Sequence, residues 1–170
     1  ATLALHAKPA ATMTAMASCA SLADCVALLG MAQQQLAAGL TGFEAMNGFS
    51  LSLVAKYMPQ LRQPLPAAPW TVLLELSDNE SEAHARDRFE GLLGQALEGG
   101  TIGDAAIAES VAQSHTMWHL RESIPLAQAE EGLNIKHDLA LPVSRIPAFC
   151  DTTQAALERA VAGVRLVNFG

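Results

Sequence analysis

The stretch Trp70-Thr-Val-Leu-Leu-Glu-Leu76 is the clearest strand signal in the chain. It is mainly apolar and rich in residues that favour strands. The loop before it carries Pro64, Pro66 and Pro69, and proline holds a backbone extended and interrupts regular structure. Residues 70–76 therefore predict a strand that begins directly after Pro69, and the other elements can be placed around it.

Upstream of this strand, strand and helix signals alternate. Residues 1–7 predict a short strand, followed by an Ala- and Met-rich stretch without a clear signal. Ser21 is suited to cap a helix, with Asp24 as its capping-box partner and apolar residues recurring at helical spacing behind it. The next expected elements are a strand over 43–46, a turn at Asn47-Gly48 and a helix over 49–57.

Downstream of the strand the alternation continues. The expected elements are a helix that begins at Ser77 or Asp78 and ends at Gly99-Gly100, a strand near 101–108, a helix over 110–124, a connection framed by Pro125 and Gly132, a strand over 134–141, a helix capped by Ser144 with Pro147 in its first turn, and a strand over 164–169. By itself this order favours a parallel α/β sheet. No Gly-rich phosphate loop supports a nucleotide-binding version of that sheet.

Composition limits the class of protein. The chain has 170 residues with 51% apolar, which fits one domain with a core of its own. Its net charge of −7 argues against nucleic acid and anionic membranes as partners. No stretch reaches the roughly 20 apolar residues of a membrane span. The odd set of Cys19, Cys25 and Cys150 indicates buried free thiols in a reducing compartment, so we expect a cytoplasmic protein.

Arg121 and Lys136 are the residues best placed to bind an anion. Arg121 shares a helix face with Met117, Leu120 and Ile124, and a guanidinium can bind a carboxylate through two parallel hydrogen bonds. A surface position or an ion pair with a nearby Glu explains Arg121 equally well. Lys136 lies on the expected strand 134–141, where a pair with Asp138 on an exposed face is the alternative.

The histidines give weaker signals. On the same expected strand His137 falls on the apolar face, which indicates a hydrogen-bonded core residue. His115 and His119 have a spacing that suits a metal, but no third ligand is evident nearby. The chain also lacks the Gly-x-Ser-x-Gly pattern of a serine nucleophile.

Several stretches of the sequence resemble one family. They are Trp118-His-Leu-Arg-Glu-Ser-Ile124, the run from Ile135 to Pro147, and the segments 43–47, 69–77 and 164–170. Together they resemble the C-terminal domain of FAD-linked oxidases, a family that includes D-lactate dehydrogenase, the glycolate oxidase flavin subunit and D-2-hydroxyglutarate dehydrogenase. The resemblance spans nearly the whole chain, and the interval between Arg121 and Lys136 also matches.

The resemblance implies an α+β fold, a ferredoxin-like cap domain whose antiparallel or mixed sheet is packed with helices, in place of the parallel sheet. It implies an FAD-dependent oxidoreductase that oxidises a D-2-hydroxy acid to the 2-oxo acid, with the cofactor carrying the redox chemistry. By matched position, Arg121 and Lys136 would bind the substrate. The resemblance further implies an electron acceptor and is compatible with a homodimer.

Part of such an enzyme is expected to lie outside residues 1–170. Strand-like runs begin near Ala1 and stop at Gly170, so we expect a single domain that is a fragment of a longer chain. The family's N-terminal FAD-binding domain would precede it. The general base and the ligands of a divalent metal such as zinc would follow Gly170. The fragment alone is then expected to be inactive.

One position departs from the family pattern. Some members have a substrate-binding Thr four residues after the Arg, where this chain has Pro125, which lacks both a hydroxyl and an N–H. A second-carboxylate contact of the 2-hydroxyglutarate type is therefore not predicted here, and the substrate acid stays open. The alternative to an enzyme domain is a stand-alone ligand-binding or regulatory α/β module, which equally explains the lack of catalytic residues.

Overall fold

The computed structural model describes residues 8–170, so the strand expected at residues 1–7 lies outside the described part. Its centre is an antiparallel sheet of four strands in the order β2-β3-β1-β4. The strands are β1 (Ala11–Cys19), β2 (Leu40–Asn47), β3 (Trp70–Asp78) and β4 (Asp104–Ile107). The strand order and the helices between the strands match a ferredoxin-like α+β fold, which confirms the prediction from the resemblance. The parallel sheet favoured by the alternation alone is wrong.

Strand β1 is the element that sequence patterning missed. It occupies the Ala- and Met-rich stretch and pairs with β3 on one side and β4 on the other. Met13, Ala15 and Ala17 face one hydrophobic cluster, while Met16 faces a second cluster on the opposite side of the sheet. A central strand that is buried on both faces shows no polar–apolar alternation.

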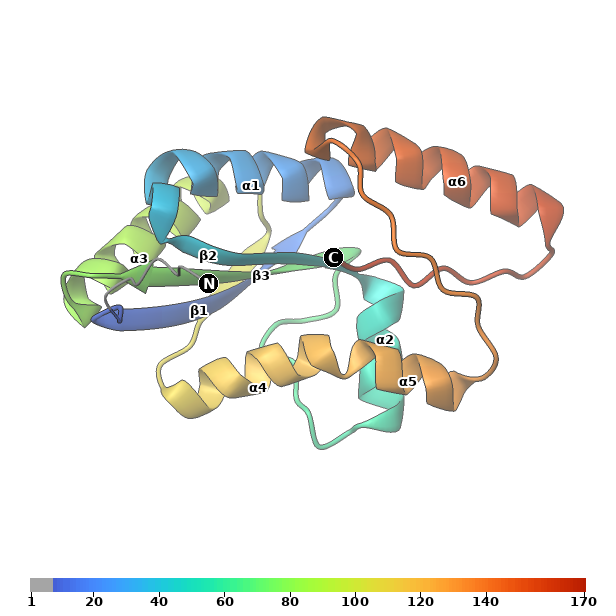
Figure 1. The fold of residues 1–170 in the computed structure, drawn as a ribbon, viewed down its shortest axis with the longest axis horizontal. Coiled ribbons are helices and arrows are strands. Elements are labelled where there is room, and N and C mark those ends of the chain that lie inside the picture. The colour runs from blue at the N-terminus through green and yellow to red at the C-terminus, as the bar shows by residue number, and fades with distance from the viewer. Residues whose placement is uncertain (1–7) are drawn as a thin grey trace, which may run out of the picture.

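Helices α1 (Leu22–Leu36) and α3 (Glu82–Glu98) cover one face of the sheet (Figure 1). Ser21 caps α1 as predicted, because its Oγ accepts a hydrogen bond from the Asp24 N–H. The cap expected at Ser77 or Asp78 is wrong. Strand β3 continues to Asp78, and Ser81 instead accepts from the N–H of His84 to begin α3. The fully buried Phe89 anchors α3 in the core.

Helices α2 (Gly48–Tyr57), α4 (Val111–Glu122) and α5 (Ile124–Glu131) cover the other face. Asn47 caps α2, since its side chain accepts from the Ser50 N–H, and does not form the expected turn. The connection expected between Pro125 and Gly132 is also wrong. Those residues form α5, because proline is tolerated in the first turn of a helix, where its missing N–H would have no intrahelical partner.

Helix α4 crosses three strands of the sheet in turn. Ser114 hydrogen-bonds Thr14 of β1, and the Trp118 indole N–H donates to Glu75 of β3 over 2.9 Å. One turn later Arg121 reaches β2. The ring of Trp118 lies over Gly42, where an added Cβ would come within 3.1 Å of that ring. Glycine at this position therefore allows the helix to approach the sheet closely.

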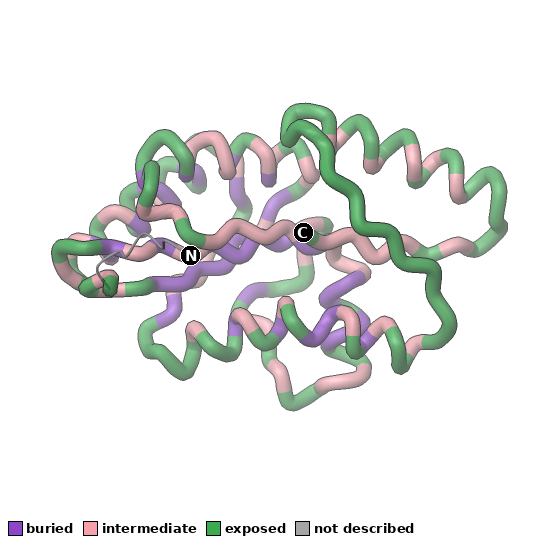
Figure 2. The backbone as a smooth tube through the Cα atoms, in the orientation of Figure 1, coloured by how far each residue is buried: buried purple, intermediate pink, exposed green. Residues whose placement is uncertain are grey.

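Residues 132–163, named here the arm, extend from the packed body (Figures 1 and 2). The strand expected over 134–141 is wrong: these residues have no regular structure, and all of them are exposed. His137 is therefore not a core residue. The arm continues through a 3-10 turn (Val143–Arg145) into α6 (Ile146–Ala160), which has Pro147 in its first turn as predicted but no side-chain cap from Ser144. No residue of α6 is buried.

The chain after the arm returns to the edge of the sheet. Residues 164–169 form no regular strand, but Phe169 bridges Met46 of β2 in antiparallel fashion. Ala45 and Gly170 exchange backbone hydrogen bonds of 2.7 and 3.0 Å. The expected terminal strand is thus present only as this short pairing. Within the described residues, no helix is both long and apolar enough for a membrane crossing.

Candidate carboxylate-binding site

Arg121 lies at the end of α4, above strand β2. Its Nη2 donates to the Glu44 Oε2 over 3.0 Å, and its guanidinium carbon lies 5.0 Å from the centre of the Phe169 ring. The two charged side chains are partly buried, with 24% of Arg121 and 23% of Glu44 exposed. The interpretation as an ion pair with a nearby Glu is confirmed. The partner comes from the sheet rather than from the same helix.

The guanidinium keeps unused donors despite this ion pair. Arg121 has five N–H groups, and a hydrogen bond from Nη2 to one oxygen of Glu44 uses a single one. Its Nε is buried and has no hydrogen-bond partner among residues 8–170. A buried donor without a partner costs free energy. The Nη donors that Glu44 does not use, on a side chain that is 24% exposed, suit Arg121 to a second, external acceptor such as a carboxylate.

Lys136 has a different environment. It lies in the exposed, irregular part of the arm and makes no hydrogen bond or ion pair with any of residues 8–170. The alternative pair with Asp138 is likewise absent from the ion pairs of the described chain. The structure therefore does not join Lys136 to Arg121, and its role in binding substrate stays a prediction.

The potential metal ligands do not form a cluster. His115 and His119 are both exposed on α4. Across residues 8–170, no group of three or more His, Cys, Asp or Glu side chains is arranged to hold a metal ion. Cys19 and Cys25 are buried free thiols as predicted, whereas Cys150 on α6 is half-buried.

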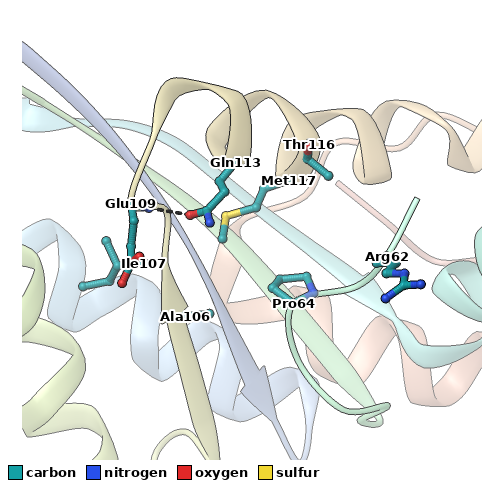
Figure 3. Close-up of a pocket in the computed structure, with 8 residues that line it drawn as sticks. All are labelled: Arg62, Pro64, Ala106, Ile107, Glu109, Gln113, Thr116 and Met117. Atoms are coloured by element: carbon teal, nitrogen blue, oxygen red, sulfur yellow. Dashed lines mark hydrogen bonds between the residues drawn. The ribbon is translucent and has the colours of Figure 1, made fainter. Parts of the chain in front are cut away.

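The described hollows lie away from Arg121. One, of about 290 Å³, opens between the loop around Pro64, strand β4 and the first half of α4 (Figure 3). Figure 3 shows Gln113 beside Met117 at its wall, where Gln113 accepts from the Glu109 N–H over 2.7 Å. A second, of about 410 Å³, lies along residues 55–67. Neither is lined by Arg121, Glu44 or Lys136.

Two charged clusters outside this site hold elements together. Glu131 at the end of α5 accepts from Lys56 and from Tyr57, each over 2.6 Å, and pairs with Arg165. The Lys56 ammonium, with the Tyr57 and Arg165 donors, holds the pKa of Glu131 down at about 2. In the second cluster, the backbone N–H of Glu80, with His84 and Arg88, lowers the pKa of Asp78.

Sequence patterning gave no role to the partners of Arg121. Glu44 belongs to the stretch Phe43-Glu-Ala-Met-Asn47, which predicts a strand and contributes to the family resemblance but assigns no role to Glu44 itself. A charge within an otherwise apolar strand is the signal that was available, since a partly buried carboxylate needs a partner. Phe169 gave no such signal, because its contact depends on the terminal segment returning to β2.

Comparison with known proteins identifies the chain's relatives. The model of the family "FAD linked oxidases, C-terminal domain" matches residues 8–170. A probable D-2-hydroxyglutarate dehydrogenase from Oryza sativa subsp. indica is 32% identical over 142 residues, which cover 82% of this chain and 25% of that protein. A D-2-hydroxyglutarate dehydrogenase from Arabidopsis thaliana is 30% identical over 132 residues, covering 78% of this chain and 24% of that protein.

A putative D-lactate dehydrogenase from Schizosaccharomyces pombe is 28% identical over 137 residues, covering 80% of this chain and 26% of that protein. These three relatives are named mitochondrial, so the expectation of a cytoplasmic protein is contradicted. Free thiols indicate a reducing compartment without saying which one. The chain spans about a quarter of the length of these relatives, and with its match over residues 8–170 it belongs to the family of FAD-linked oxidase C-terminal domains.

Proposed function

We propose that this chain is the substrate-side domain of an FAD-dependent dehydrogenase that oxidises a D-2-hydroxy acid to the 2-oxo acid. The observation that carries the proposal is Arg121, a partly buried guanidinium that is held by Glu44 through one N–H and keeps further Nη donors. The family of the chain and the names of the chain's relatives support the same substrate class. Lys136 is proposed as a second contact to substrate oxygens.

In this proposal Arg121 binds the carboxylate of the substrate and holds its orientation. A guanidinium that donates two parallel hydrogen bonds fixes the plane of a carboxylate as well as its position. A positioned substrate reacts faster because the entropy of orientation has already been lost on binding. Neither Arg121 nor Lys136 is a general base while protonated, so the proton of the substrate hydroxyl must go to another group.

FAD is implied by the family, and when bound it supplies the redox chemistry. The two described hollows, of about 290 and 410 Å³, are open, and neither adjoins Arg121. They do not form a site for a dinucleotide next to the proposed substrate contact. We propose that the residues that hold FAD lie mainly in another part of the longer protein, and we assign no FAD contact within residues 8–170.

The other partners also belong to the longer protein. A divalent metal such as zinc, an electron acceptor and a homodimer stay predictions for it. The identity of the substrate acid also stays open, because the relatives include proteins named for D-2-hydroxyglutarate and for D-lactate. Pro125 occupies the first turn of α5 and offers neither a hydroxyl nor an N–H to a second carboxylate.

The test uses the full-length protein, purified with its own cofactor. It should contain flavin. Under anaerobic conditions, that flavin should be reduced by D-lactate or D-2-hydroxyglutarate but not by the L enantiomers. Reduction of an artificial electron acceptor then gives kcat and KM. A full-length protein that contains no flavin would overturn the proposal and favour a ligand-binding module.

Replacing Arg121 tests the residue that carries the proposal. Arg121→Ala should lower kcat/KM. The corresponding loss of transition-state stabilisation should be about 2–4 kcal/mol, the scale for removing one partner of a buried charged contact. Arg86→Ala is the matched control, because Arg86 lies on α3 across the sheet and pairs only with Glu90 in the described chain. Unchanged kinetics for Arg121→Ala would remove Arg121 from the site.

A further inference from the structure

The Glu44 carboxylate stands at an unusual place for a charge. It lies in the middle of β2, opposite Leu73 of β3, where an apolar residue would be expected. The backbone around it is fixed on both sides, since Ala45 pairs with Val72 and also exchanges hydrogen bonds with Gly170. With 23% of its side chain exposed, Glu44 loses part of its hydration, and such a carboxylate persists only with a partner.

Arg121 is the partner that Glu44 has. Within residues 8–170, the bond to Arg121 is the single side-chain hydrogen bond and the single ion pair of Glu44. A long Arg side chain loses rotamer entropy when it is fixed, so an unsupported guanidinium would not keep one orientation. Glu44 on one edge and the Phe169 ring at 5.0 Å together restrict it.

The pair with Glu44 leaves other N–H groups of Arg121 unused, because it takes up a single one. Glu44 accepts one hydrogen bond from one nitrogen of the guanidinium. It therefore does not form the two parallel bonds that an Arg–carboxylate pair can make. The charge of Glu44 also compensates Arg121 while no substrate is bound, when an unpaired, partly buried cation would be costly. Both effects favour a site that is oriented before the substrate arrives.

We propose that Glu44 is the positioning residue that orients Arg121 for the substrate carboxylate, with the Phe169 ring as a second support. The proposal rests on the proposed function, because it gives Glu44 a role through Arg121 in the same site. Glu44 itself does not contact the substrate. Removing Glu44 should therefore weaken substrate binding only as long as Arg121 is present.

The experiment compares substitutions in the full-length flavoprotein. Glu44→Ala should raise KM for the 2-hydroxy acid by about tenfold with a smaller change in kcat, because the carboxylate contact exists in both the ground and the transition state. Glu44→Gln keeps an oxygen acceptor in place and should recover most of the loss. The dissociation constant of the 2-oxo acid product, followed by the change in flavin absorbance, should rise in parallel with KM.

Glu75→Ala is the matched control for Glu44→Ala. Glu75 lies on the neighbouring strand β3 and binds Trp118 of the same helix, so its loss tests whether loosening α4 is enough to raise KM. KM should stay unchanged in Glu75→Ala, even if its melting temperature falls as far as that of Glu44→Ala. An equal rise of KM in both variants would overturn the proposal, because Glu44 would then act only through the packing of the helix.

The double variant Glu44→Ala with Arg121→Ala tests whether Glu44 acts through Arg121 or independently of it. Once Arg121 is absent, loss of Glu44 should not raise KM further, since residues that act through one contact are not additive. A further rise would overturn the positioning role, as would a Glu44→Ala protein with unchanged KM while Arg121→Ala is impaired. Failure of the proposed function would look different: no 2-hydroxy acid would reduce the flavin of the unsubstituted protein.

Discussion

Helix α4 and the arm each carry one of the two residues predicted to bind substrate, but their surroundings differ. In α4, Met117 and Leu120 are buried against the sheet, and Arg121 is tied to β2. In the arm, Leu133 and Ile135 directly before Lys136 are both exposed, with 87% of Ile135 accessible. The helix fixes its charge within this chain, whereas the arm does not.

This difference shows that two residues of one family pattern need not be held equally by the rest of the described chain. Arg121 is held before any ligand binds, so little conformational entropy is lost when it binds one. Lys136 must be ordered when it binds, and ordering a long side chain together with its backbone costs free energy. We therefore expect Arg121 to supply most of the affinity for a carboxylate, and Lys136 to supply less.

The largest effect should come from breaking the packed body. Phe89→Ala removes a fully buried ring of α3 and should lower the free energy of unfolding by about 3–5 kcal/mol. Leu139→Ala in the arm, where 66% of the side chain is exposed, should change it by less than about 0.5 kcal/mol. Urea unfolding of the chain, followed by circular dichroism, measures both values. Similar losses would mean that the arm is packed in solution.

The body could be predicted where local signals agree with the packing. The cap at Ser21 and the strand from Trp70 follow from capping chemistry and from an apolar run after prolines. Strand β1 could not, because its small residues serve two cores at once and show no period. Residues 134–141 gave the opposite error. They alternate as a strand does, but no neighbouring strand pairs with them.

The site was predictable only in part for a similar reason. The apolar face beside Arg121 can be seen in the sequence, since helical spacing is a local property. Its partner cannot, because the contact with Glu44 depends on the register of β2 beneath α4. The Phe169 contact depends on the return of the chain after the arm. Non-local pairing thus decides which of the predicted charges are held in place.

A smaller effect is expected from Lys136, and it would sharpen the contrast with Arg121. Lys136→Ala in the full-length protein should lower kcat/KM by roughly 1.5–3 kcal/mol, the scale of a hydrogen bond to a charged group. The same substitution should leave the unfolding free energy of the 170-residue chain unchanged, because Lys136 is exposed and makes no hydrogen bond or ion pair with residues 8–170. Steady-state kinetics and urea unfolding test the two halves. An unchanged kcat/KM would exclude Lys136 from the site.

The smallest effect is expected from substitution of Glu131, whose side chain binds Lys56 of α2 and Arg165 in the segment after the arm. Glu131 directly precedes the arm, and its partner Arg165 follows it, so their ion pair closes the arm at its base. The partners Lys56 and Arg165 are more than half exposed, and such pairs contribute little to stability. Glu131→Gln should therefore lower the melting temperature only slightly at pH 7.

Acid should remove even this small difference in melting temperature between Glu131→Gln and the unsubstituted chain. Folding lowers the pKa of Glu131 from its ordinary value of 4.5 to about 2, first through Lys56 and then through Tyr57 and Arg165. A lowered pKa means that the stabilisation is complete above pH 4.5 and is lost as the pH falls towards 2. The gap between the two melting temperatures should accordingly narrow over that range. Glu98→Gln, which removes an exposed carboxylate at the end of α3, should show no such trend. A gap that stays constant from pH 7 to pH 3 would mean that the arm is not closed by this carboxylate.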